Sequence, residues 1–424
     1  MSIKSVIKKI IPPVVLGAYH YLLALAGAVV FGFPSRKLTV IGVTGTSGKS
    51  TTVDFIARIL EEAGHKTASM SSVRFKIGQQ EEKNTLKMTM PGRFKVQKFL
   101  RQAVRENCKY AVLEVTSEGI KQSRHKFIRF TTAVFTNLSP EHIESHGGFE
   151  NYRNEKLKLF KAVNNTHIIN LDDSSTEYFL KIPARQKYFF TAKEHLNLEF
   201  KEKNQNTFEA KDIKIEEKKL VFSVNGTQFT LNLLGNFNIY NALAAICVGA
   251  SEGISLEVCK KALEKAKSIP GRMEIVNNNP LVVVDYAHTP EQLELAYKSL
   301  APKPLVCVLG SCGGGRDKWK RPVLGKIAKQ YCKEIIITNE DPYDEDPSQI
   351  LSEIKSGISN YQFPISNFYE ILDRKEAIKK ALELAKPEDA VIITGKGSEM
   401  WMCLASGKKI PWDDRKIARE SLGQ

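Results

Sequence analysis

The sequence predicts an α/β fold in which parallel sheets are flanked by helices. Short apolar runs rich in β-branched residues alternate along the chain with amphipathic stretches, which is the pattern of such a fold. A glycine-rich loop follows the first run, Leu38 to Val43, and precedes a helical stretch. The other strand-like runs cover residues 110–115, 132–138, 166–171, 281–287, 304–310, 334–339 and 389–395.

Changes of pattern divide the chain into parts. Residues 189–233 alternate polar and apolar side chains around Asn-Gly turns, which predicts an antiparallel meander. A helix is expected from Asn241 to Glu252. A break near "KSIPGRME", residues 267–274, begins a second α/β series. We therefore predict an apolar helical N-terminal segment, 1–36, a central domain, 37–267, and a C-terminal domain, 268–424.

The N-terminal segment contains "VVLGAYHYLLALAGAVVFGF", residues 14–33, with basic residues on both sides. This run is close to the minimal length of a membrane-spanning helix. No small-residue cleavage site follows it, so a removed signal peptide is not expected. Two alternatives stay open: a helix on or in the cytoplasmic leaflet with its lysines on anionic lipid, or a helical hairpin packed on the protein itself.

Composition narrows the partners and the compartment. The formal net charge of +15 favours nucleic acid, an anionic membrane surface or a polyanionic small substrate. We predict no nucleic-acid partner, because Lys and Arg are scattered and no binding motif accompanies them. Seven cysteines without a CxxC pair fit a reducing cytoplasm better than a disulfide scaffold or a zinc ribbon. We therefore expect a cytoplasmic protein, with membrane association on the cytoplasmic face as the open alternative. The sequence does not determine the oligomeric state, for which a monomer is favoured.

The loop "TGTSGKSTT", residues 44–52, has the chemistry of a phosphate-binding P-loop. Glycines let the backbone approach a phosphate, and the N–H groups at the start of the following helix bind the anion. Lys49 neutralises phosphate charge, and the Ser50 hydroxyl can bind magnesium. The predicted ATP-binding residues of the loop are Gly45, Thr46, Ser47, Gly48, Lys49, Ser50 and Thr51.

This loop and the segments that follow it in order resemble the Mur ligase family. "LEVTSEGI" (113–120) resembles the family's EVSSH stretch, and "FTNLSPEHIESHGGFENYRNEKLKLF" (135–160) resembles its TNLSRDHLDYHG stretch. "LLGNFNIYNALAA", "PGRMEIV" and "VVDYAHTPEQL" are similar to further family segments. "GSCGGGRDKWKRP", "TNEDPYDEDP", "GKGSE" and "IPWDDRKIARE" are nearest to the MurE branch. The resemblance covers residues 38–422 and implies a P-loop ATPase domain with a parallel sheet, followed by a Rossmann-like C-terminal α/β domain.

The family's activity makes chemical sense of these residues. The resemblance implies that ATP phosphorylates an acceptor carboxylate and that an amine attacks the acyl phosphate, giving an amide, ADP and phosphate. Such chemistry depends on charge neutralisation more than on a covalent nucleophile. The implied cofactors are ATP, Mg²⁺ and a carbamylated lysine.

The resemblance also assigns roles to single residues. Lys49 and Ser50 would hold the phosphates and a first magnesium. Glu114 and His142 match ligands of a second magnesium, and Lys156 stands where the family carries its carbamylated lysine. The implied nucleotide ligands of the later segments are Asn238 and Asn241 for adenine, and Arg272, Asp285 and His288 for phosphates and ribose. The implied substrate residues are Thr116 and Ser117 for the acceptor, and Arg316, Asp341, Tyr343, Gly395 and Glu399 for the amino acid.

Two departures from the family bear on the substrates. MurE-type enzymes start with a domain that grips the UDP-MurNAc carrier, and too few residues precede the P-loop strand here for it, so weaker carrier binding or a lipid-linked carrier is expected. Diaminopimelate enzymes read DNPR, whose arginine binds the distal carboxylate; here Tyr343 takes that place. The acidic residues around it, Glu340, Asp341, Asp344 and Glu345, would favour a distal ammonium, as in lysine or ornithine.

Three hypotheses about function stay open at this point. The leading one is an ATP-dependent, MurE-like ligase of peptidoglycan precursor synthesis that adds a diamino acid to a muramoyl-L-Ala-D-Glu acceptor. The second is a MurT-like ligase or amidating subunit that acts on a lipid-linked precursor. The third, from another class, is a catalytically silent nucleotide-binding protein, which ATP turnover would exclude.

Overall fold

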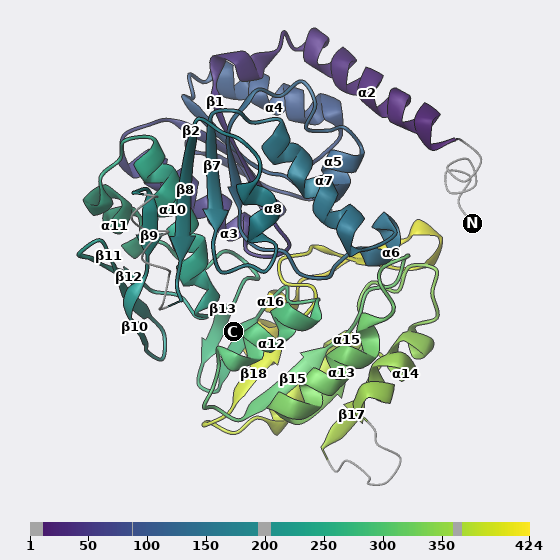
Figure 1. The fold of residues 1–424 in the computed structure, drawn as a ribbon. Helices are drawn as coiled ribbons and strands as arrows, with labels where there is room; N and C mark the ends of the chain where they lie inside the picture. The colour runs from purple at the N-terminus through teal and green to yellow at the C-terminus, as the bar shows by residue number, and fades with distance from the viewer. Residues whose placement is uncertain (1–11, 87, 194–204, 359–366) are drawn as a thin grey trace. The chain divides into compact units, whose positions relative to one another are not determined.

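The computed structural model describes residues 12–86, 88–193, 205–358 and 367–424, and the chain divides into two compact units (Figure 1). Unit 1 comprises Met1–Pro140, Phe149–Asn232 and Asn236–Lys267. Unit 2 comprises Glu141–Gly148, Leu233–Gly235 and Ser268–Gln424. The segment Glu141–Gly148 therefore belongs to unit 2 by its contacts, although it lies in sequence between two parts of unit 1.

Unit 1 is built on a nine-stranded sheet with the order β4-β3-β2-β5-β1-β6-β7-β8-β9 (Figure 1). Its strands are β1 (Thr39–Thr44), β2 (Thr67–Met70), β3 (Arg74–Ile77), β4 (Gln80–Lys83), β5 (Tyr110–Glu114), β6 (Phe130–Phe135), β7 (Thr166–Asn170), β8 (Gln186–Thr191) and β9 (Thr207–Glu209). From β2 to β9 all neighbours pair in parallel, and β3 pairs antiparallel with both β2 and β4. The segments after β1, β5 and β6 consequently meet at one edge, where ligands of such sheets bind.

Helices and a small sheet complete unit 1. The helices are α2 (Pro13–Val30), η1 (Pro34–Lys37), α3 (Lys49–Glu62), α4 (Arg93–Arg105), α5 (Ser117–Lys121), α7 (Phe149–Lys161), α8 (Thr176–Leu180), α10 (Phe237–Ser251) and α11 (Leu256–Glu264). The small antiparallel sheet has the order β10 (Lys211–Ile215), β11 (Leu220–Val224), β12 (Thr227–Leu231). Asn225 and Gly226 make the turn between β11 and β12, both at positive φ.

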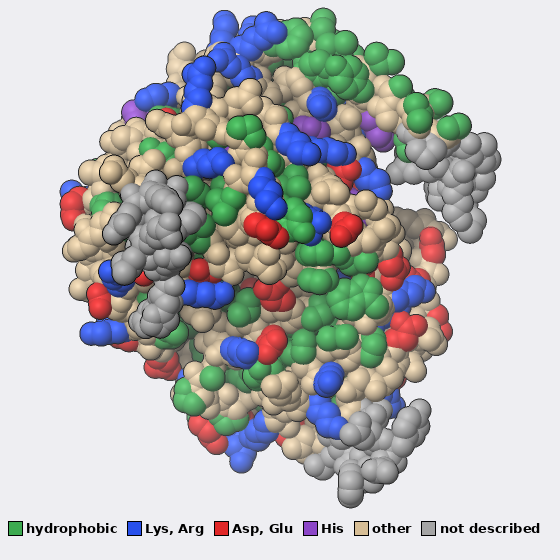
Figure 2. All heavy atoms as spheres, in the orientation of Figure 1, with side chains coloured by type: hydrophobic (Ala, Val, Ile, Leu, Met, Phe, Trp, Pro, Cys, Tyr) green, Lys and Arg blue, Asp and Glu red, His purple; other side chains and the backbone are tan. Residues whose placement is uncertain are grey.

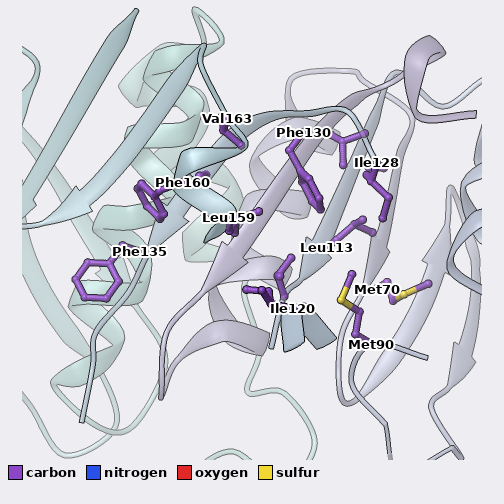
Figure 3. Close-up of a cluster of buried hydrophobic side chains, with 14 of the residues drawn as sticks. Met70, Met90, Leu113, Ile120, Ile128, Phe130, Phe135, Leu159, Phe160 and Val163 are labelled. Atoms are coloured by element: carbon purple, nitrogen blue, oxygen red, sulfur yellow. The ribbon is translucent and has the colours of Figure 1, made fainter. Parts of the chain in front are cut away.

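The core of unit 1 fixes α7 against the sheet. Figure 3 shows side chains of α7, Leu159 and Phe160, in the same buried cluster as Phe130 and Phe135 of β6. Phe179 of α8 stacks on Phe135 with ring centroids 3.8 Å apart and meets Phe160 edge-on at 4.9 Å. Because burial of these rings is strongly favourable, α7 and the side chains it carries have a defined position.

Unit 2 has a six-stranded sheet of its own, with the order β13-β14-β18-β15-β16-β17. Its strands are β13 (Glu274–Asn278), β14 (Leu281–Val284), β15 (Leu305–Leu309), β16 (Cys332–Ile337), β17 (Phe368–Glu370) and β18 (Ala390–Ile393), with a separate hairpin of β19 (Trp401–Cys403) and β20 (Lys409–Pro411). Only β13 of the six pairs antiparallel. The helices are α6 (Ile143–His146), α12 (Pro290–Lys298), α13 (Lys320–Tyr331), α14 (Pro347–Ile358), α15 (Arg374–Leu384), η2 (Ala405–Gly407) and α16 (Asp414–Ser421).

The predicted fold class is confirmed, with two corrections in detail. Two α/β sheets dominated by parallel strands follow an apolar helix, as expected. The meander prediction holds for β10–β12 but is wrong at its start, because β8 and β9 extend the nine-stranded sheet in parallel. Residues 194–204 of that stretch lie outside the described residues. The helix expected from Asn241 starts at Phe237.

The apolar N-terminal segment forms the single helix α2. Its side chains Ala24 and Ala28 are buried, and Gly27 lies against the first residues of α4. The second alternative is therefore wrong about a hairpin over residues 13–30, but one side of the helix does pack on the protein, as that alternative expected. In the part of the chain that the structure describes, no helix is both long and apolar enough to cross a membrane.

The cysteine expectation also needs a correction. Cys307 of β15 and Cys332 at the start of β16 form a disulfide, with their Cα atoms 6.0 Å apart. Pairing of the two neighbouring strands brings these residues together, and their spacing in sequence does not reveal that pairing. The other five cysteines are free.

Candidate functional site

The glycine-rich loop joins β1 to α3 and is bound to the segment that follows β6. The Thr46 N–H donates to the Asn137 carbonyl at 2.9 Å, and the Ser47 N–H donates to the Asn137 side-chain oxygen at 2.8 Å. Lys49 begins α3, and its ammonium donates to the Thr46 carbonyl at 2.7 Å. The lysine charge therefore lies over the loop at the N-terminal end of a helix, where an anion is favoured.

Gly48 permits a close approach of α10 to this loop. Its φ of 76° is left-handed, and a side chain there would collide with the Asn241 amide. The Asn241 side-chain oxygen accepts from the Thr52 hydroxyl at 3.3 Å, and its nitrogen donates to the Asn238 side-chain oxygen at 3.0 Å. Both asparagines predicted for adenine are thus buried beside the loop, and the Asn241 amide also ties α10 to α3.

Ser50 and Glu114 come together at the carboxyl ends of β1 and β5. The Ser50 hydroxyl donates to Glu114 Oε2 at 2.7 Å, and the Ser72 N–H donates to the same oxygen at 2.9 Å. Both side chains are buried. Carboxylate and hydroxyl oxygens are the donors that Mg²⁺ prefers, so this pair fits a magnesium ion.

Lys156 is a buried amine on α7 beside the same loop. It is 1 % exposed, and its Nζ donates to the Gly45 carbonyl at 2.7 Å. The same nitrogen lies 4.5 Å from the ring centroid of Tyr152, whose hydroxyl is 3.0 Å from the Thr46 hydroxyl. An ammonium has donors only and cannot bind a cation, so Lys156 fits a metal site only as a carbamate.

The residues predicted for the acceptor follow β5 directly. The Thr116 hydroxyl accepts from the Gly119 N–H at 3.1 Å and caps α5. Ser117 is 3 % exposed at the first position of that helix. Both hydroxyls therefore lie one turn or less from the carboxyl end of β5, next to Glu114.

Two arginines beside this turn were not foreseen from the sequence. Arg124 donates to the Gln122 side chain at 2.7 Å and to the Met90 carbonyl, and its buried Nε has no hydrogen-bond partner among the described residues. Burial lowers the pKa of Arg124, and the neighbouring charge of Arg93 lowers it further. A bound carboxylate or phosphate would relieve both effects, so the pair can hold an anion.

Arg272 and Asp285 form a second constellation, in unit 2. Asp285 accepts from the Met273 and Ala287 N–H groups, each at 2.7 Å. Burial raises the pKa of the Asp285 carboxyl, while Arg272 acts in the opposite direction. The Arg272 guanidinium lies 4.1 Å from the ring centroid of Tyr286. Arg272 therefore offers a cation that can bind phosphate, and Asp285 offers a carboxylate that can accept hydrogen bonds from hydroxyl groups.

His288 joins the segment that carries His142. Its Nε2 is 2.7 Å from Glu141 Oε1, and its Nδ1 is 2.8 Å from the Tyr286 carbonyl. His142 Nε2 lies 3.6 Å from Glu141, and His142 Nδ1 lies 3.5 Å from the Arg316 guanidinium. The predicted residues His142, His288 and Arg316 are therefore neighbours within unit 2.

Asp317 also binds the segment Glu141–Gly148, which carries His142. Its carboxylate accepts from the Ile143 N–H at 3.2 Å and from the Glu144 N–H at 3.0 Å, while the Lys318 N–H donates to Glu144 at 2.9 Å. These bonds cap α6 immediately after His142. Asp317 thus positions His142 although it was assigned no role from the sequence.

Lys396 contacts two of the acidic residues that are predicted to bind the amino-acid substrate. It is 1 % exposed, and its Nζ lies 2.9 Å from Asp341 Oδ1 and 3.1 Å from Glu399 Oε2. Asp341 also accepts from the Cys403 N–H at 2.7 Å. The Asp341 charge is thereby neutralised inside the protein, so the expectation that it attracts a distal ammonium needs correction.

The other acidic residues of the cluster also have hydrogen-bond or ion-pair partners, or are buried. Glu340 is buried, which raises the pKa of its carboxyl, and Gly395 (φ 105°) leaves room for it. Asp344 accepts from the Ser406 N–H at 2.8 Å, and Glu345 pairs with Arg321 at 2.9 Å. Of the predicted acidic rim, Asp344 is exposed and its charge is not neutralised by any cation among the described residues, whereas Glu340 is buried and Asp341 and Glu345 pair with basic side chains. Tyr343 lies against Gly314 at a left-handed φ of 52°.

The predicted site residues thus fall into two sets, one in each unit. Unit 1 brings together the P-loop, Glu114, Lys156, Asn238, Asn241, Thr116 and Ser117; unit 2 holds Arg272, Asp285, His288, His142, Arg316, Asp341, Tyr343, Gly395 and Glu399. Among the described residues, no group of three or more His, Cys, Asp or Glu side chains could hold a metal ion. The expected metal set contains only two such residues, Glu114 and His142, and they fall in different units.

Besides Asp317, three further residues were not predicted from the sequence: Asn137, Arg124 and Lys396. Each stands in a segment already singled out, "FTNLS", the stretch after "LEVTSEGI", and "GKGSE". A polar side chain directly after a parallel strand was the available signal for Asn137. The bonds of Lys396 to Asp341 span 55 positions and had no local signal.

Comparisons with known proteins find matches over most of the chain. Residues 43–249 match the model of the Mur ligase middle domain, and residues 271–397 match that of the Mur ligase glutamate ligase domain. The chain is 38 % identical over 416 residues to the UDP-N-acetylmuramoyl-L-alanyl-D-glutamate–2,6-diaminopimelate ligase of Syntrophomonas wolfei, covering 94 % of this chain and 81 % of that protein. It is 33 % identical over 437 residues to the enzyme of the same name from Bacillus cereus, covering 97 % and 84 %.

Solved structures give the same picture of the fold. A structure of a UDP-N-acetylmuramoyl-L-alanyl-D-glutamate–2,6-diaminopimelate ligase matches with a TM-score of 0.59 and 29 % identity, covering 91 % of this chain and 78 % of the other. The Mycobacterium tuberculosis folylpolyglutamate synthase, complexed with ADP and AMPPCP, matches with a TM-score of 0.71 and 16 % identity, covering 95 % of both chains. The second likeness concerns the fold alone.

Proposed function

Because the chain belongs to the Mur ligase family, we propose that its two sets of site residues join a diamino acid to a muramoyl-L-Ala-D-Glu acceptor. The enzyme is an ATP-dependent, ADP-forming ligase of peptidoglycan precursor synthesis, similar to MurE. Family members use ATP and Mg²⁺. The identity of the substrates and the roles of single residues are parts of the proposal.

The proposed reaction has two steps. An oxygen of the acceptor carboxylate attacks the γ-phosphorus of ATP, ADP leaves, and an acyl phosphate forms. The amine of the incoming amino acid then attacks the acyl carbon, phosphate leaves, and the amine loses a proton. Both steps move negative charge between oxygens, so positioned cations and N–H donors contribute most of the catalysis.

The arrangement of Ser50, Glu114 and Lys49 is the observation that carries this proposal. The first two form a buried oxygen pair at 2.7 Å, and the lysine begins the helix that follows the loop. When bound, Mg²⁺ would neutralise phosphate oxygens beside this pair. Lys49 would neutralise the transferred phosphoryl group, and Thr46, Ser47 and Thr51 would line it. His142 and a carbamylated Lys156 would complete the metal ligands.

The remaining predicted site residues are proposed to bind either the nucleotide or the two substrates. Asn238 and Asn241 are proposed for the adenine side, and Arg272, Asp285 and His288 for phosphates and ribose. Thr116 and Ser117, with Arg124 nearby, would bind a carboxylate of the acceptor. This division corresponds to an ATP-binding domain over 37–267 and an amino-acid-binding domain over 268–424.

For the amine, we propose lysine or ornithine ahead of diaminopimelate. The curated relatives are named for 2,6-diaminopimelate, which supports a diamino acid. In this chain Tyr343 stands where such enzymes carry the arginine that binds the distal carboxylate, so a second carboxylate loses its bidentate partner. Arg316 would hold the α-carboxylate, with Asp341, Gly395 and Glu399 around it.

We also propose that residues 14–33 keep the enzyme at the cytoplasmic face of a membrane or at a lipid-linked acceptor. The exposed apolar side chains of α2 support this part of the proposal. A lipid-linked acceptor would make the reaction resemble that of MurT-type ligases.

A crossed panel of substrates tests the ligase proposal. The full chain, ATP and Mg²⁺ are combined with lysine, ornithine or meso-diaminopimelate and with UDP-linked or lipid-linked muramoyl dipeptide, and phosphate release and product mass are measured. Lys49→Ala should reduce turnover roughly a hundredfold or more, because the phosphoryl charge loses its main cation. Lys66→Ala, which removes an exposed ion pair with Glu106, is the control. Near-normal ligation by Lys49→Ala would contradict the assignment.

A further inference from the structure

The outer face of α2 is an apolar stripe that the rest of the described chain leaves uncovered. Val15, Leu22 and Val29 are 55 %, 61 % and 58 % exposed and recur every seven residues, which places them on one side of the helix. Val14, Tyr19 and Val30 are exposed beside them. The opposite side, with Ala24 and Ala28, packs on unit 1. The helix therefore has an attachment face and a free face.

The free face lacks the polar residues that a water-facing helix normally carries. No charged residue occurs between Pro13 and Val30, and the first acidic residue of the whole chain is Asp54. Surface helices of globular proteins place charged or polar residues opposite their core side. Contiguous exposed apolar surface of this kind marks an interaction site.

Basic residues border this apolar face. The neighbouring helix α4 carries five of them and no acid: Arg93, Lys95, Lys98, Arg101 and Arg105. Arg36 and Lys37 of η1, which follows α2 in sequence and contacts α4, add two more. Figure 2 shows Lys and Arg side chains beside the apolar side chains over α2 in the upper part of the view.

Three of these basic residues have no acidic partner in the described part of the chain. Among the described residues, no carboxylate lies within ion-pair distance of Lys95, Lys98 or Arg105, and all three are exposed. Elsewhere on the surface lysines do have such partners, as in the pair of Lys379 with Glu376 at 2.8 Å. An unpaired basic border around an apolar stripe is the combination that an anionic lipid surface complements.

We propose that α2 and α4 form a docking surface for an anionic lipid bilayer. The apolar stripe of α2 enters the headgroup region parallel to the membrane, and the Lys and Arg side chains of α4 and η1 contact lipid phosphates. This inference rests on the membrane part of the proposed function, and it names the bilayer itself as the partner. A second copy of the chain would cover the stripe but would repel the basic border.

Binding of the full chain to vesicles tests the proposal. Sedimentation is measured with vesicles of phosphatidylcholine alone and of phosphatidylcholine mixed with phosphatidylglycerol. We expect binding only to the mixed vesicles and weakening as ionic strength rises. Equal binding to both kinds of vesicle, or to neither, would overturn the proposal.

Two sets of variants separate the apolar and the basic contributions. Val15→Gln with Leu22→Gln should abolish binding, because the exposed apolar contact is lost. Lys95→Gln, Lys98→Gln and Arg105→Gln together should weaken it roughly hundredfold. The control changes Lys379, Lys380 and Lys416 to Gln, an equal loss of charge on unit 2, and should bind like the native chain.

Phosphate release with a soluble acceptor separates this inference from the proposed ligase activity. It should be unchanged in all these variants, because none of the substituted residues belongs to the site. Vesicle binding is measured without substrates. Binding can therefore fail while ligation succeeds, and ligation can fail while binding succeeds. Self-association that disappears in the Val15→Gln, Leu22→Gln variant, without vesicle binding, would assign the stripe to a dimer and overturn the proposal.

Discussion

At the scale of the single residue, Lys156 combines features that a surface lysine lacks. It is 1 % exposed and bonds to the Gly45 carbonyl of the P-loop. Carbon dioxide is attacked by the neutral form of a lysine amine, which carries the lone pair that the ammonium lacks. Under the proposal, a carbamate formed here with release of a proton would place an anion at the P-loop, where it would help to hold a metal ion.

We expect Lys156→Ala to lose ligation roughly 10- to 100-fold, the loss typical of a group that supports a metal ligand set. Formate or acetate should restore part of the activity, because a small carboxylate can replace the missing anion. ¹³C-bicarbonate should give a carbamate signal in the native protein only. Lys158→Ala, two residues along on the exposed side of α7, is the control. Full activity of Lys156→Ala would show that the lysine only supports the loop.

His125 makes a pH-dependent contribution to stability. It is 4 % exposed, neither ring nitrogen has a hydrogen-bond partner in the described part of the chain, and burial lowers its pKa from 6.5 to about 4. Between these pH values the unfolded chain binds a proton that the folded chain does not. The free energy of unfolding should therefore fall as pH falls from 6.5 to 4, by about 3 kcal/mol in all.

Urea unfolding at a series of pH values measures this slope. His125→Phe keeps a ring of similar size and removes the titration, so its stability should depend less on pH within that window. His65→Gln, at a partly exposed position, should keep the slope of the native protein. An unchanged slope in His125→Phe would mean that another titratable group causes the pH dependence of stability.

At the scale of the element, local patterns predict what local contacts determine. β1, the P-loop and α3 follow from an apolar run, two glycines and an amphipathic stretch that are adjacent in sequence. The strands of both sheets follow likewise from short β-branched runs. β8 and β9 were misassigned because parallel pairing with a distant strand leaves no mark on the alternation within each strand.

Features that depend on distant residues could not be predicted in this way. The segment Glu141–Gly148 joins unit 2 through Asp317, which is more than 170 positions away. The acids near Tyr343 appeared to form an open rim, because their partners Lys396, Arg321 and the Ser406 N–H lie elsewhere in the sequence. Motifs therefore predict candidate site residues, but they do not predict which of the charges are neutralised in the fold.

The cap that Asp317 provides leads to a prediction about α6. Asp317→Ala removes the acceptor of two N–H groups next to His142, a loss of about 1 kcal/mol. If His142 binds magnesium, half-maximal activity should then require roughly fivefold more Mg²⁺. Asp317→Asn keeps one acceptor oxygen, so its Mg²⁺ requirement should lie between that of the native protein and that of Asp317→Ala.

The matched control is Asp373→Ala, because Asp373 likewise caps a helix, α15, by accepting from the Lys375 and Glu376 N–H groups. It should lose similar stability and keep the native Mg²⁺ requirement. If both variants change the Mg²⁺ requirement equally, Asp317 acts only through stability.

At the scale of the whole molecule, the fold alone does not determine which amine substrate the enzyme uses. The chain superposes on a folylpolyglutamate synthase with a TM-score of 0.71 and on a diaminopimelate ligase with 0.59, so the architecture is common to ligases with different substrates. Selection must come from a few side chains on that fold. Tyr343 is the clearest candidate, because it replaces a guanidinium by a neutral ring.

Tyr343→Arg should therefore change the amine preference of the enzyme. Returning a guanidinium to this position gives a distal carboxylate a bidentate partner, and the ratio of kcat/KM for diaminopimelate to that for lysine should rise roughly ten- to hundredfold. The left-handed φ of 52° is no obstacle peculiar to Arg, because Tyr already adopts it. Tyr343→Phe is the control and should keep the native ratio, since it adds no charge. Competition among lysine, ornithine and meso-diaminopimelate measures the ratio. The opposite result, a native enzyme with its highest kcat/KM for diaminopimelate and no shift in Tyr343→Arg, would mean that another cation serves the distal carboxylate and that Tyr343 does not select the amine.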